Sequence, residues 1–313
     1  MNRIVFKIVC LCKSRVSYAY LTVCKRKREK DDFLSFFSHE IELASIKSST
    51  KRNHFTTWNL LQTFQSSIAF AELTFDFLTR FDYFMQNQGL HTNTIAKHMK
   101  QLKRYVNLAV HKGYISWEQY PFRHYKIKAV DSHHTFLMPD ELYKLEKLEL
   151  AGKHLNLQKT LDAFLFCCYT GMRYSDFTHL SYSNLKEGNW LEYTSVKTGA
   201  CVRLPLSLLF HGKPMCILEK YRIDLNSFFC LKDNSNVNKE LNRIARLAGL
   251  HTTVTFHTAR HTNATLLIYI GVNITTVQKL LGHKSIKTTQ LYSAILDQTI
   301  IHDLGKCFTG KID

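Results

Sequence analysis

The sequence predicts a mainly α-helical protein with a small antiparallel β-sheet, divided into two domains. The chain has 313 residues, which is enough for two hydrophobic cores of ordinary size. Apolar residues recur every three or four positions through much of 31–113 and from 236 onward, a spacing typical of helices. Short β-prone runs at 190–195 and 202–206 flank Lys197-Thr198-Gly199, which indicates a hairpin.

Four helices are expected in the first part of the chain. The first lies within 31–46, and the second follows 48–50 and passes through Phe64. Thr74 is the expected N-cap of the third helix, which ends at Gly89, and the fourth extends from Thr92 to Gly113. We expect the third helix to bury Phe75, Phe77, Leu78, Phe81 and Phe84.

The second part begins after an aperiodic basic stretch. Pro139 suits the first turn of a new helix, 161–169 has the composition of a buried helix, and Gly171 ends it. The expected division is an irregular basic N-terminal segment at 1–28, a helical domain at 29–122, a linker at 123–135, and a second domain at 136–313 with a C-terminal tail at 293–313.

The charge balance favours a polyanionic partner. The chain carries 42 Lys and Arg against 25 Asp and Glu, a formal charge of +17. The alternatives are a merely solvated basic surface or a face that meets acidic lipid. On the fourth helix, Lys97, Lys100 and Arg104 share one face, which suits contact with phosphates, although solvated side chains explain each of them equally well. A basic run at 25–30 is either a nucleic-acid-binding arm or a solvated linker.

Targeting and redox signals are weak. The sequence has no unbroken run of 18 uncharged apolar residues and no clear signal peptide, so we expect no membrane partner. Nine scattered cysteines without a CxxC pair indicate reduced thiols and a cytoplasmic location.

The stretch 257–292 carries the chemistry. It contains His257, Arg260, His283 and Tyr292. Imidazole and guanidinium groups donate hydrogen bonds to crowded anionic oxygens, and a tyrosine hydroxyl can attack phosphorus. The combination predicts phosphoryl transfer through a covalent phosphotyrosine. We expect neighbouring cations to lower the Tyr292 pKa from its usual value of about 10.

Two residues upstream extend this set. Arg173 lies in TGMRYSDF and Lys197 lies in the predicted hairpin turn. A guanidinium keeps its proton and bonds two oxygens at once, which suits a phosphate clamp. The alternatives are a surface salt bridge between Arg173 and Asp176, and an ordinary exposed turn lysine.

A zinc site is a competing hypothesis for this stretch. His257 and His261 are spaced i, i+4, as zinc ligands are on one helix face. Thr258 stands where a metalloprotease has its catalytic glutamate, so we expect no metal and no other cofactor. We interpret His261 as a capping or packing residue.

The chain resembles the tyrosine recombinase (phage integrase) family in five elements: TGxR, the hairpin lysine, HxxR, LGH and the final tyrosine. The residue pattern is closest to mobile-element integrases of Bacteroidetes-type bacteria. The resemblance implies a helical core-binding (SAM-like) domain followed by a mixed α/β catalytic domain of the DNA breaking-rejoining type. Such integrases usually carry an arm-binding module ahead of the core-binding domain; residues 1–28 are too short and too irregular for a whole module, and a remnant of one is the alternative to an unrelated segment.

The resemblance assigns a role to each catalytic residue. Tyr292 attacks a phosphate and forms a 3′-phosphotyrosyl link, Arg173 and Arg260 hold the phosphate, His257 and His283 assist, and Lys197 protonates the leaving 5′-oxygen.

The implied activity is site-specific recombination for integration or excision of a mobile element in a bacterial cytoplasm. The implied partners are double-stranded DNA at specific sites, three further copies of the chain in a homotetramer, and accessory DNA-bending or directionality factors. Two alternatives stay open: a DNA-binding protein of this fold without strand exchange, and a nicking-resealing enzyme like type IB topoisomerases.

Overall fold

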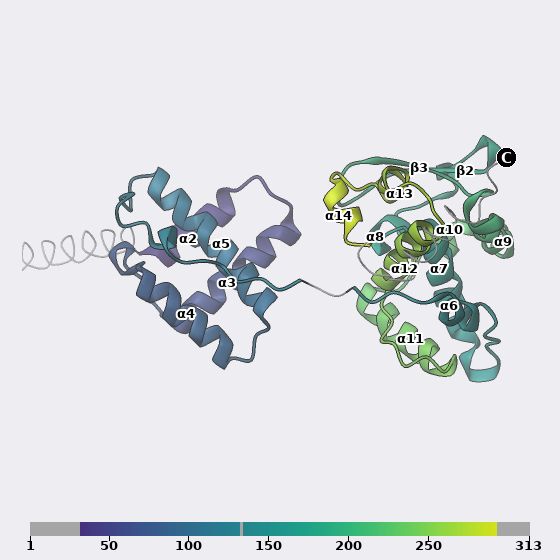
Figure 1. Ribbon diagram of the computed structural model, residues 1–313, viewed down its shortest axis with the longest axis horizontal. Helices are drawn as coiled ribbons and strands as arrows, with labels where there is room; N and C mark the ends of the chain where they lie inside the picture. The colour runs from purple at the N-terminus through teal and green to yellow at the C-terminus, as the bar shows by residue number, and fades with distance from the viewer. Residues whose placement is uncertain (1–31, 132–133, 293–313) are drawn as a thin grey trace, which may run out of the picture. The chain divides into compact units, whose positions relative to one another are not determined.

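The computed structural model describes residues 32–131 and 134–292, which form two compact units that divide between Ser132 and His133 (Figure 1). The N-terminal segment 1–28, the basic run 25–30 and the tail 293–313 lie outside the described residues. Within the described ranges, no helix is long and apolar enough to cross a bilayer.

The first unit contains the four helices that the sequence predicts. Asp32 and Thr74 cap two of them, because their side chains accept hydrogen bonds from the backbone N–H groups of Ser35 at 2.9 Å and Phe77 at 3.2 Å. The elements are α2 (Phe33–Leu43), α3 (Ser48–Phe64), η1 (Phe70–Glu72), α4 (Phe75–Asn87), α5 (Thr92–His111) and η2 (Pro121–Arg123).

The core of the first unit is rich in phenylalanine and has polar groups sealed between α3 and α5. His54 Nδ1 lies 2.7 Å from the Tyr105 hydroxyl, and the Thr57 hydroxyl lies 2.7 Å from His98 Nδ1. Burial lowers the pKa of both histidines, so both rings stay neutral. The expectation for Phe75 is wrong: it begins α4 on the outer side and half of it is exposed.

The second unit has the helical content and the small sheet expected from the sequence. In chain order it contains α6 (Pro139–Glu146), η3 (Gly152–Leu157), α7 (Gln158–Thr170), α8 (Tyr174–Phe177), η4 (Tyr182–Asn184), β1 (Leu185–Lys186), η5 (Glu187–Asn189), β2 (Trp190–Thr194), β3 (Cys201–Pro205), η6 (Leu209–Gly212), α9 (Lys213–Lys220), α10 (Leu225–Phe229), α11 (Asn234–Leu247), α12 (Phe256–Tyr269), α13 (Ile274–Leu281) and α14 (Ile286–Gln290).

The sheet is antiparallel with the order β1-β2-β3. Strands β2 and β3 form the expected hairpin, with Leu191 opposite Leu204 and both buried. The two-residue strand β1, which the sequence does not signal, adds an edge by pairing Leu185 with Leu191. The turn 195–200 therefore projects from one end of a ribbon whose inner face is apolar.

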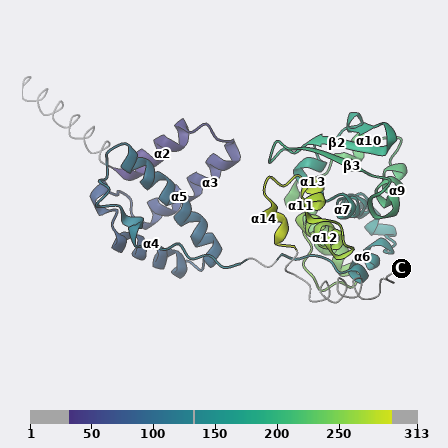
Figure 2. The same cartoon turned by 45° about the horizontal axis from the view of Figure 1, so that its top comes forward.

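Helix α7 is the centre of the second unit and packs along α12 (Figure 2). Its side chains from Thr160 to Thr170 are all buried, which explains the unbroken apolar composition of this segment. Gly171 ends the helix in the left-handed conformation, with φ of 69°. The helix end therefore delivers the TGMR segment to the same side of the unit as α12.

Candidate active site

Helix α12 carries three of the polar side chains of the site on one face. His257, Arg260 and His261 are spaced at i, i+3 and i+4, so they lie on adjacent turns. Arg260 is 1% exposed and His261 is 8% exposed, whereas His257 is exposed at the N-terminal end of the helix. This face of α12 is therefore exposed at His257 and buried at Arg260 and His261.

Arg260 fastens two distant segments to α12. Its Nη1 donates to the Gly171 carbonyl at 2.7 Å, and its Nη2 donates to the Leu281 carbonyl at 2.6 Å. Burial lowers the pKa of Arg260 to about 10, and the charge of Arg173 adds to this effect. The guanidinium still carries its charge at neutral pH. It leaves three N–H donors for other partners.

Two glycines allow these segments to approach closely. A Cβ on Gly171 would lie 2.5 Å from Leu281 Cδ2 and 2.6 Å from Asn263 Oδ1. A Cβ on Gly282, which has φ of 62°, would lie 2.7 Å from Val202 Cγ2. The TGMR and LGH segments therefore need glycine both for backbone conformation and for space.

Arg173 is tied to the β2–β3 hairpin through Asp176. Its Nη1 lies 3.5 Å from Asp176 Oδ2 and donates to Ser195 Oγ at 3.2 Å. The Asp176 carboxylate also accepts from the Val196 N–H at 2.8 Å and from the Ser195 hydroxyl at 3.2 Å. The pair between Arg173 and Asp176 exists but is not a surface salt bridge, because the Asp176 side chain is fully buried and the Arg173 side chain is 12% exposed.

Lys197 lies exposed in the turn that Asp176 anchors. The turn is closed by Gly199 N–H donating to the Ser195 carbonyl at 2.7 Å. The charge of Lys197 contributes to lowering the pKa of both His257 and His283, so its ammonium group acts on the same site.

Tyr292 lies inside the cluster, with 5% of its surface exposed. Its hydroxyl is 3.0 Å from His261 Nδ1, and its ring is parallel to that of His283, with 6.4 Å between centroids. Burial raises the pKa of Tyr292 above its usual value, while Arg260 and Arg173 oppose the shift. The expectation of a lowered pKa is therefore wrong: desolvation outweighs the two cations.

His283 is presented by the end of α13. Gly282 is the left-handed C-cap, and His283 N–H donates to the Gln278 carbonyl at 3.1 Å. Its Nδ1 lies 2.9 Å from the hydroxyl of Thr289, which is completely buried on α14. This contact holds the ring by one nitrogen and leaves Nε2 for another partner.

The three histidines of the site are neutral at physiological pH. Desolvation by the surrounding side chains lowers the pKa of His257 to about 4, and those of His261 and His283 to about 3. The positive charge of Arg260 acts on all three. Each ring can therefore donate through one nitrogen and accept through the other.

The sequence did not single out several residues that the structure brings to the site. His261 was interpreted as a packing residue, yet it contacts the Tyr292 hydroxyl; its place in the HxxRH run was the available signal. His134 stacks on His261 with 4.5 Å between centroids. Asp176, Ser195 and Thr289 act through other side chains; the sequence offered Asp176 only as a surface partner of Arg173, and no spacing marks Ser195 or Thr289.

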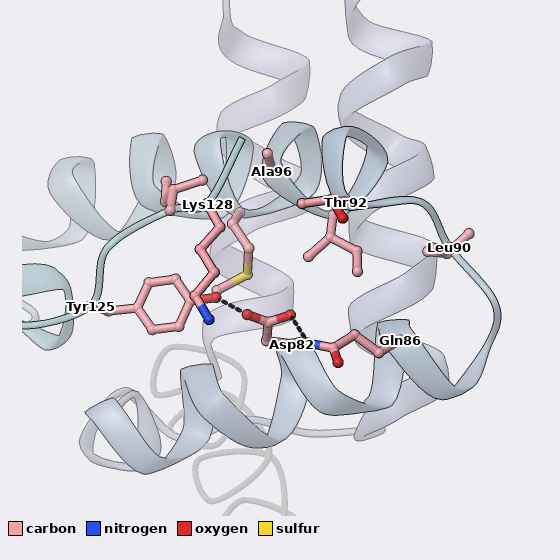
Figure 3. Close-up of a pocket in the computed structure, with 10 residues that line it drawn as sticks. Asp82, Gln86, Leu90, Thr92, Ala96, Tyr125 and Lys128 are labelled. Carbon is pink, nitrogen blue, oxygen red and sulfur yellow. Dashed lines mark hydrogen bonds between the residues drawn. The ribbon is translucent and has the colours of Figure 1, made fainter. Parts of the chain in front are cut away.

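The expected DNA-contacting residues lie in the first unit. Lys97, Lys100 and Arg104 are exposed along one side of α5. The first unit also has a cavity of about 210 Å³ where α4 and α5 meet the segment 125–128 (Figure 3). There the Tyr125 hydroxyl donates to Asp82, and Gln86 donates to the same carboxylate at 3.0 Å. This cavity contains none of the expected catalytic residues.

No group of three or more His, Cys, Asp or Glu side chains that could hold a metal ion occurs within 32–131 and 134–292. The pair His257 and His261, spaced as zinc ligands are, instead packs edge to face with 4.6 Å between ring centroids.

Comparison with protein families gives two matches that together cover most of the chain. Residues 32–127 match the phage integrase SAM-like domain, and residues 145–299 match the phage integrase family. Tyrosine recombinase XerD of Oceanobacillus iheyensis is 26% identical over 287 residues, which cover 85% of this chain and 93% of that protein. Tyrosine recombinase XerD of Listeria innocua is 26% identical over 281 residues, with 85% and 93% covered.

Solved structures share the fold. A lambda integrase tetramer bound to a Holliday junction superposes with a TM-score of 0.70 at 18% identity, covering 83% of this chain and 76% of that chain. The Tn1549 transposon integrase in complex with a circular intermediate DNA gives 0.70 at 16% identity, with 88% and 99% covered. A helical SAM-like unit followed by an integrase-type unit is therefore the fold of this chain.

Proposed function

We propose that this chain, which belongs to the phage integrase (tyrosine recombinase) family and is a site-specific DNA recombinase, cuts and rejoins DNA through a 3′-phosphotyrosyl intermediate on Tyr292. The observation that carries the proposal is the placement of the Tyr292 hydroxyl against His261, in a cluster with His283 and under the charges of Arg260 and Arg173. A tyrosine so placed is suited to meet a phosphodiester that the cations attract.

In the proposed reaction, the Tyr292 hydroxyl gives its proton to a neutral imidazole of the site, its oxygen bonds to phosphorus, and the bond to the 5′-oxygen breaks. Arg173 and Arg260 balance the charge that builds on the non-bridging oxygens. His257 and His283 donate to the same oxygens, and the exposed Lys197 gives its proton to the leaving 5′-oxygen. A 5′-hydroxyl from a partner strand reverses the step, so no energy source is needed.

The buried resting state of Tyr292 fits this scheme. An entering phosphodiester brings a negative charge beside Arg173 and Arg260, and it offsets the repulsion that adds to desolvation in lowering the pKa of His257 and His283. DNA binding therefore raises the pKa of these two histidines, which favours proton transfer in the site.

We further propose that the chain acts as a homotetramer on two DNA sites and serves integration or excision of a mobile element in a bacterial cytoplasm. The lambda integrase tetramer and the Tn1549 transposon integrase support this by their likeness in fold. The wording of 254–292 supports the placement among mobile-element integrases of Bacteroidetes type. We propose that residues 29–122 and 136–313 act as the core-binding and catalytic domains.

Trapping on a nicked suicide duplex tests the proposal. The wild-type chain should form a covalent adduct that resists denaturation, in the presence of EDTA because the cations are side chains, and Tyr292→Phe should form none. An adduct unchanged in Tyr292→Phe, or one with a strict metal requirement, contradicts the proposal. Recombinant products from two sites then separate strand exchange from nicking and resealing.

We also propose that Lys97, Lys100 and Arg104 contact the DNA backbone. Each substitution to alanine should lower the slope of log affinity against log salt by about one. Lys103→Ala is the matched control on the same helix, because the Lys103 ammonium lies 5.7 Å from the Phe122 ring centre. Equal slopes in all four variants would exclude a role for this side of α5.

A further inference from the structure

The Tyr292 side chain packs on an apolar core and has one hydrogen-bond partner for its hydroxyl among the described residues. The ring packs in a small core with Ala264, Leu267, Val277 and Leu281, and His261 Nδ1 lies 3.0 Å from its oxygen. A buried phenol O–H needs an acceptor, since leaving it unpaired costs free energy. The His261 ring is therefore the group that decides where the phenol oxygen sits.

Two ring contacts and its place in a helix restrain the His261 side chain. His134 stacks on it at 4.5 Å between centroids with 19° between planes, and His257 meets it edge to face at 4.6 Å and 82°. Its backbone belongs to α12, directly after Arg260. A ring held on two sides and by its own helix has little freedom to turn, so its Nδ1 is a fixed point.

Arg260 relates this fixed point to the phosphate-binding groups. Its guanidinium is held to the Gly171 and Leu281 carbonyls, and so cannot shift independently of α12. His261, the next residue of the helix, contacts the Tyr292 hydroxyl. The distance between the nucleophile and the guanidinium therefore depends on two consecutive residues of one helix.

We propose that His261 is a positioning residue for the nucleophile, whose Nδ1 accepts the hydrogen bond of the Tyr292 hydroxyl and holds the phenol oxygen in register with Arg260. This inference rests on the proposed function. It differs from the roles assigned above, in which His257 and His283 face the phosphate oxygens. His261 acts on the attacking group instead.

The protonation state of His261 supports this role. Burial, with the neighbouring rings and Arg260, lowers its pKa to about 3. The imidazole is therefore neutral at the pH of the cell, and with its proton on Nε2 it presents a lone pair on Nδ1. A protonated ring carries N–H groups on both nitrogens. Its Nδ1 would then donate to the phenol oxygen and could not accept the hydrogen bond of the hydroxyl.

Two amide substitutions separate Nδ1 from Nε2. The side-chain amide of asparagine places a polar atom near the position of Nδ1, whereas that of glutamine places one near Nε2. We expect His261→Asn to form the suicide-substrate adduct within about twofold of the wild-type rate. His261→Gln and His261→Leu should be about three- to tenfold slower, the effect of one neutral hydrogen bond on a barrier.

The affinity for an intact duplex should be unchanged in all three variants, since His261 does not contact phosphate in this account. Equal rates in the wild type and the three variants overturn the proposal. So does a His261→Asn rate as low as that of His261→Gln, a faster His261→Leu, or a loss confined to DNA affinity. The Asn and Gln variants keep the test decisive if the Leu variant does not fold.

A second measurement does not depend on activity. Nitrogen-15 NMR of the full chain should show His261 neutral with its proton on Nε2, and Tyr292→Phe should shift the Nδ1 resonance. A proton on Nδ1, or a resonance that ignores Tyr292→Phe, overturns the inference. A wild-type chain without any adduct overturns the proposed function, whereas wild-type adduct rates in every His261 variant overturn only the role of His261.

Discussion

Helix α12 holds Arg260 and His261 in the interior of the second unit, whereas the turn 195–200 carries Lys197 on its surface. Arg260 on α12 is fixed by two buried carbonyls, one 89 residues away in sequence and one 21 residues away. Lys197 is exposed, and its turn is anchored through the buried Asp176. One part of the site is therefore built into the core, and the other is an exposed charge on an anchored turn.

This difference has a chemical consequence. A group that must hold the phosphate in one place gains from burial and from a rigid fold, because preorganised donors need no rearrangement during the reaction. A group that must deliver a proton to a leaving oxygen gains from reach and from a flexible stem. We therefore expect substitutions on α12 to affect folding and chemistry together, and substitutions at Lys197 to affect chemistry alone.

Lys197→Ala should have a large effect on the reaction and almost none on folding. We expect adduct formation to fall by about a hundred- to a thousandfold, the usual contribution of a general acid. The urea unfolding free energy should stay within about 0.5 kcal/mol of wild type, because the side chain is exposed.

A 5′-bridging phosphorothiolate substrate tests the chemical role of Lys197, because its thiolate leaves without a proton. Lys197→Ala should cleave this substrate almost as fast as the wild-type chain does. A defect of equal size on both substrates would show that Lys197 binds DNA rather than protonating the leaving group.

Arg260→Ala should destabilise the second unit by about 3 kcal/mol, since it leaves the buried Gly171 and Leu281 carbonyls without their donor. Adduct formation should be lost as well. Urea unfolding followed by circular dichroism measures the first effect. Unchanged stability would mean that the α12 contacts do not hold the two loops.

A pair of glycines with the same backbone angle compares the two regions directly. Gly171 and Gly199 both have φ of 69°, but an added Cβ would lie within 2.6 Å of two side-chain atoms only at Gly171. Gly171→Ala should therefore cost about 1–3 kcal/mol more than Gly199→Ala in urea unfolding. Equal losses of unfolding free energy in the two variants would mean that the cost comes from the backbone conformation alone.

The sequence predicted the local parts of this picture and missed the long-range ones. The HxxR and LGH spacings are set by helix geometry and a glycine cap, so they can be read along the chain. The carbonyl partners of Arg260 lie in other segments, and no local pattern encodes them. Phe75 was misplaced because an apolar residue at a helix start fits the helical spacing on either face.

The same limit applies to electrostatics. The cations near Tyr292 predicted a lowered pKa, whereas the structure gives a raised one. A sequence shows which groups are charged but not how far each is desolvated. The exposed turn that holds Lys197 was easier to predict, since a hairpin and its turn are contiguous.

Acidic pH gives the smallest expected effect. His257, His261 and His283 have pKa values of about 4, 3 and 3 in the folded chain, below the ordinary 6.5 of the unfolded chain. The unfolded state therefore binds protons first, and stability falls as pH drops below about 6.5. Between pH 7 and pH 5, His261→Asn should lose less unfolding free energy than wild type, by on the order of 1 kcal/mol. Identical losses would contradict the lowered pKa.

Peptide mapping of the trapped adduct tests the central claim most directly. Protease digestion of the chain captured on a suicide duplex, followed by mass spectrometry, identifies the residue that carries the 3′-phosphate. The proposed phosphotyrosyl mechanism predicts a single modified peptide with the nucleotide on Tyr292. A nucleotide on any other residue, or a captured chain whose Tyr292 peptide is unmodified, would contradict it.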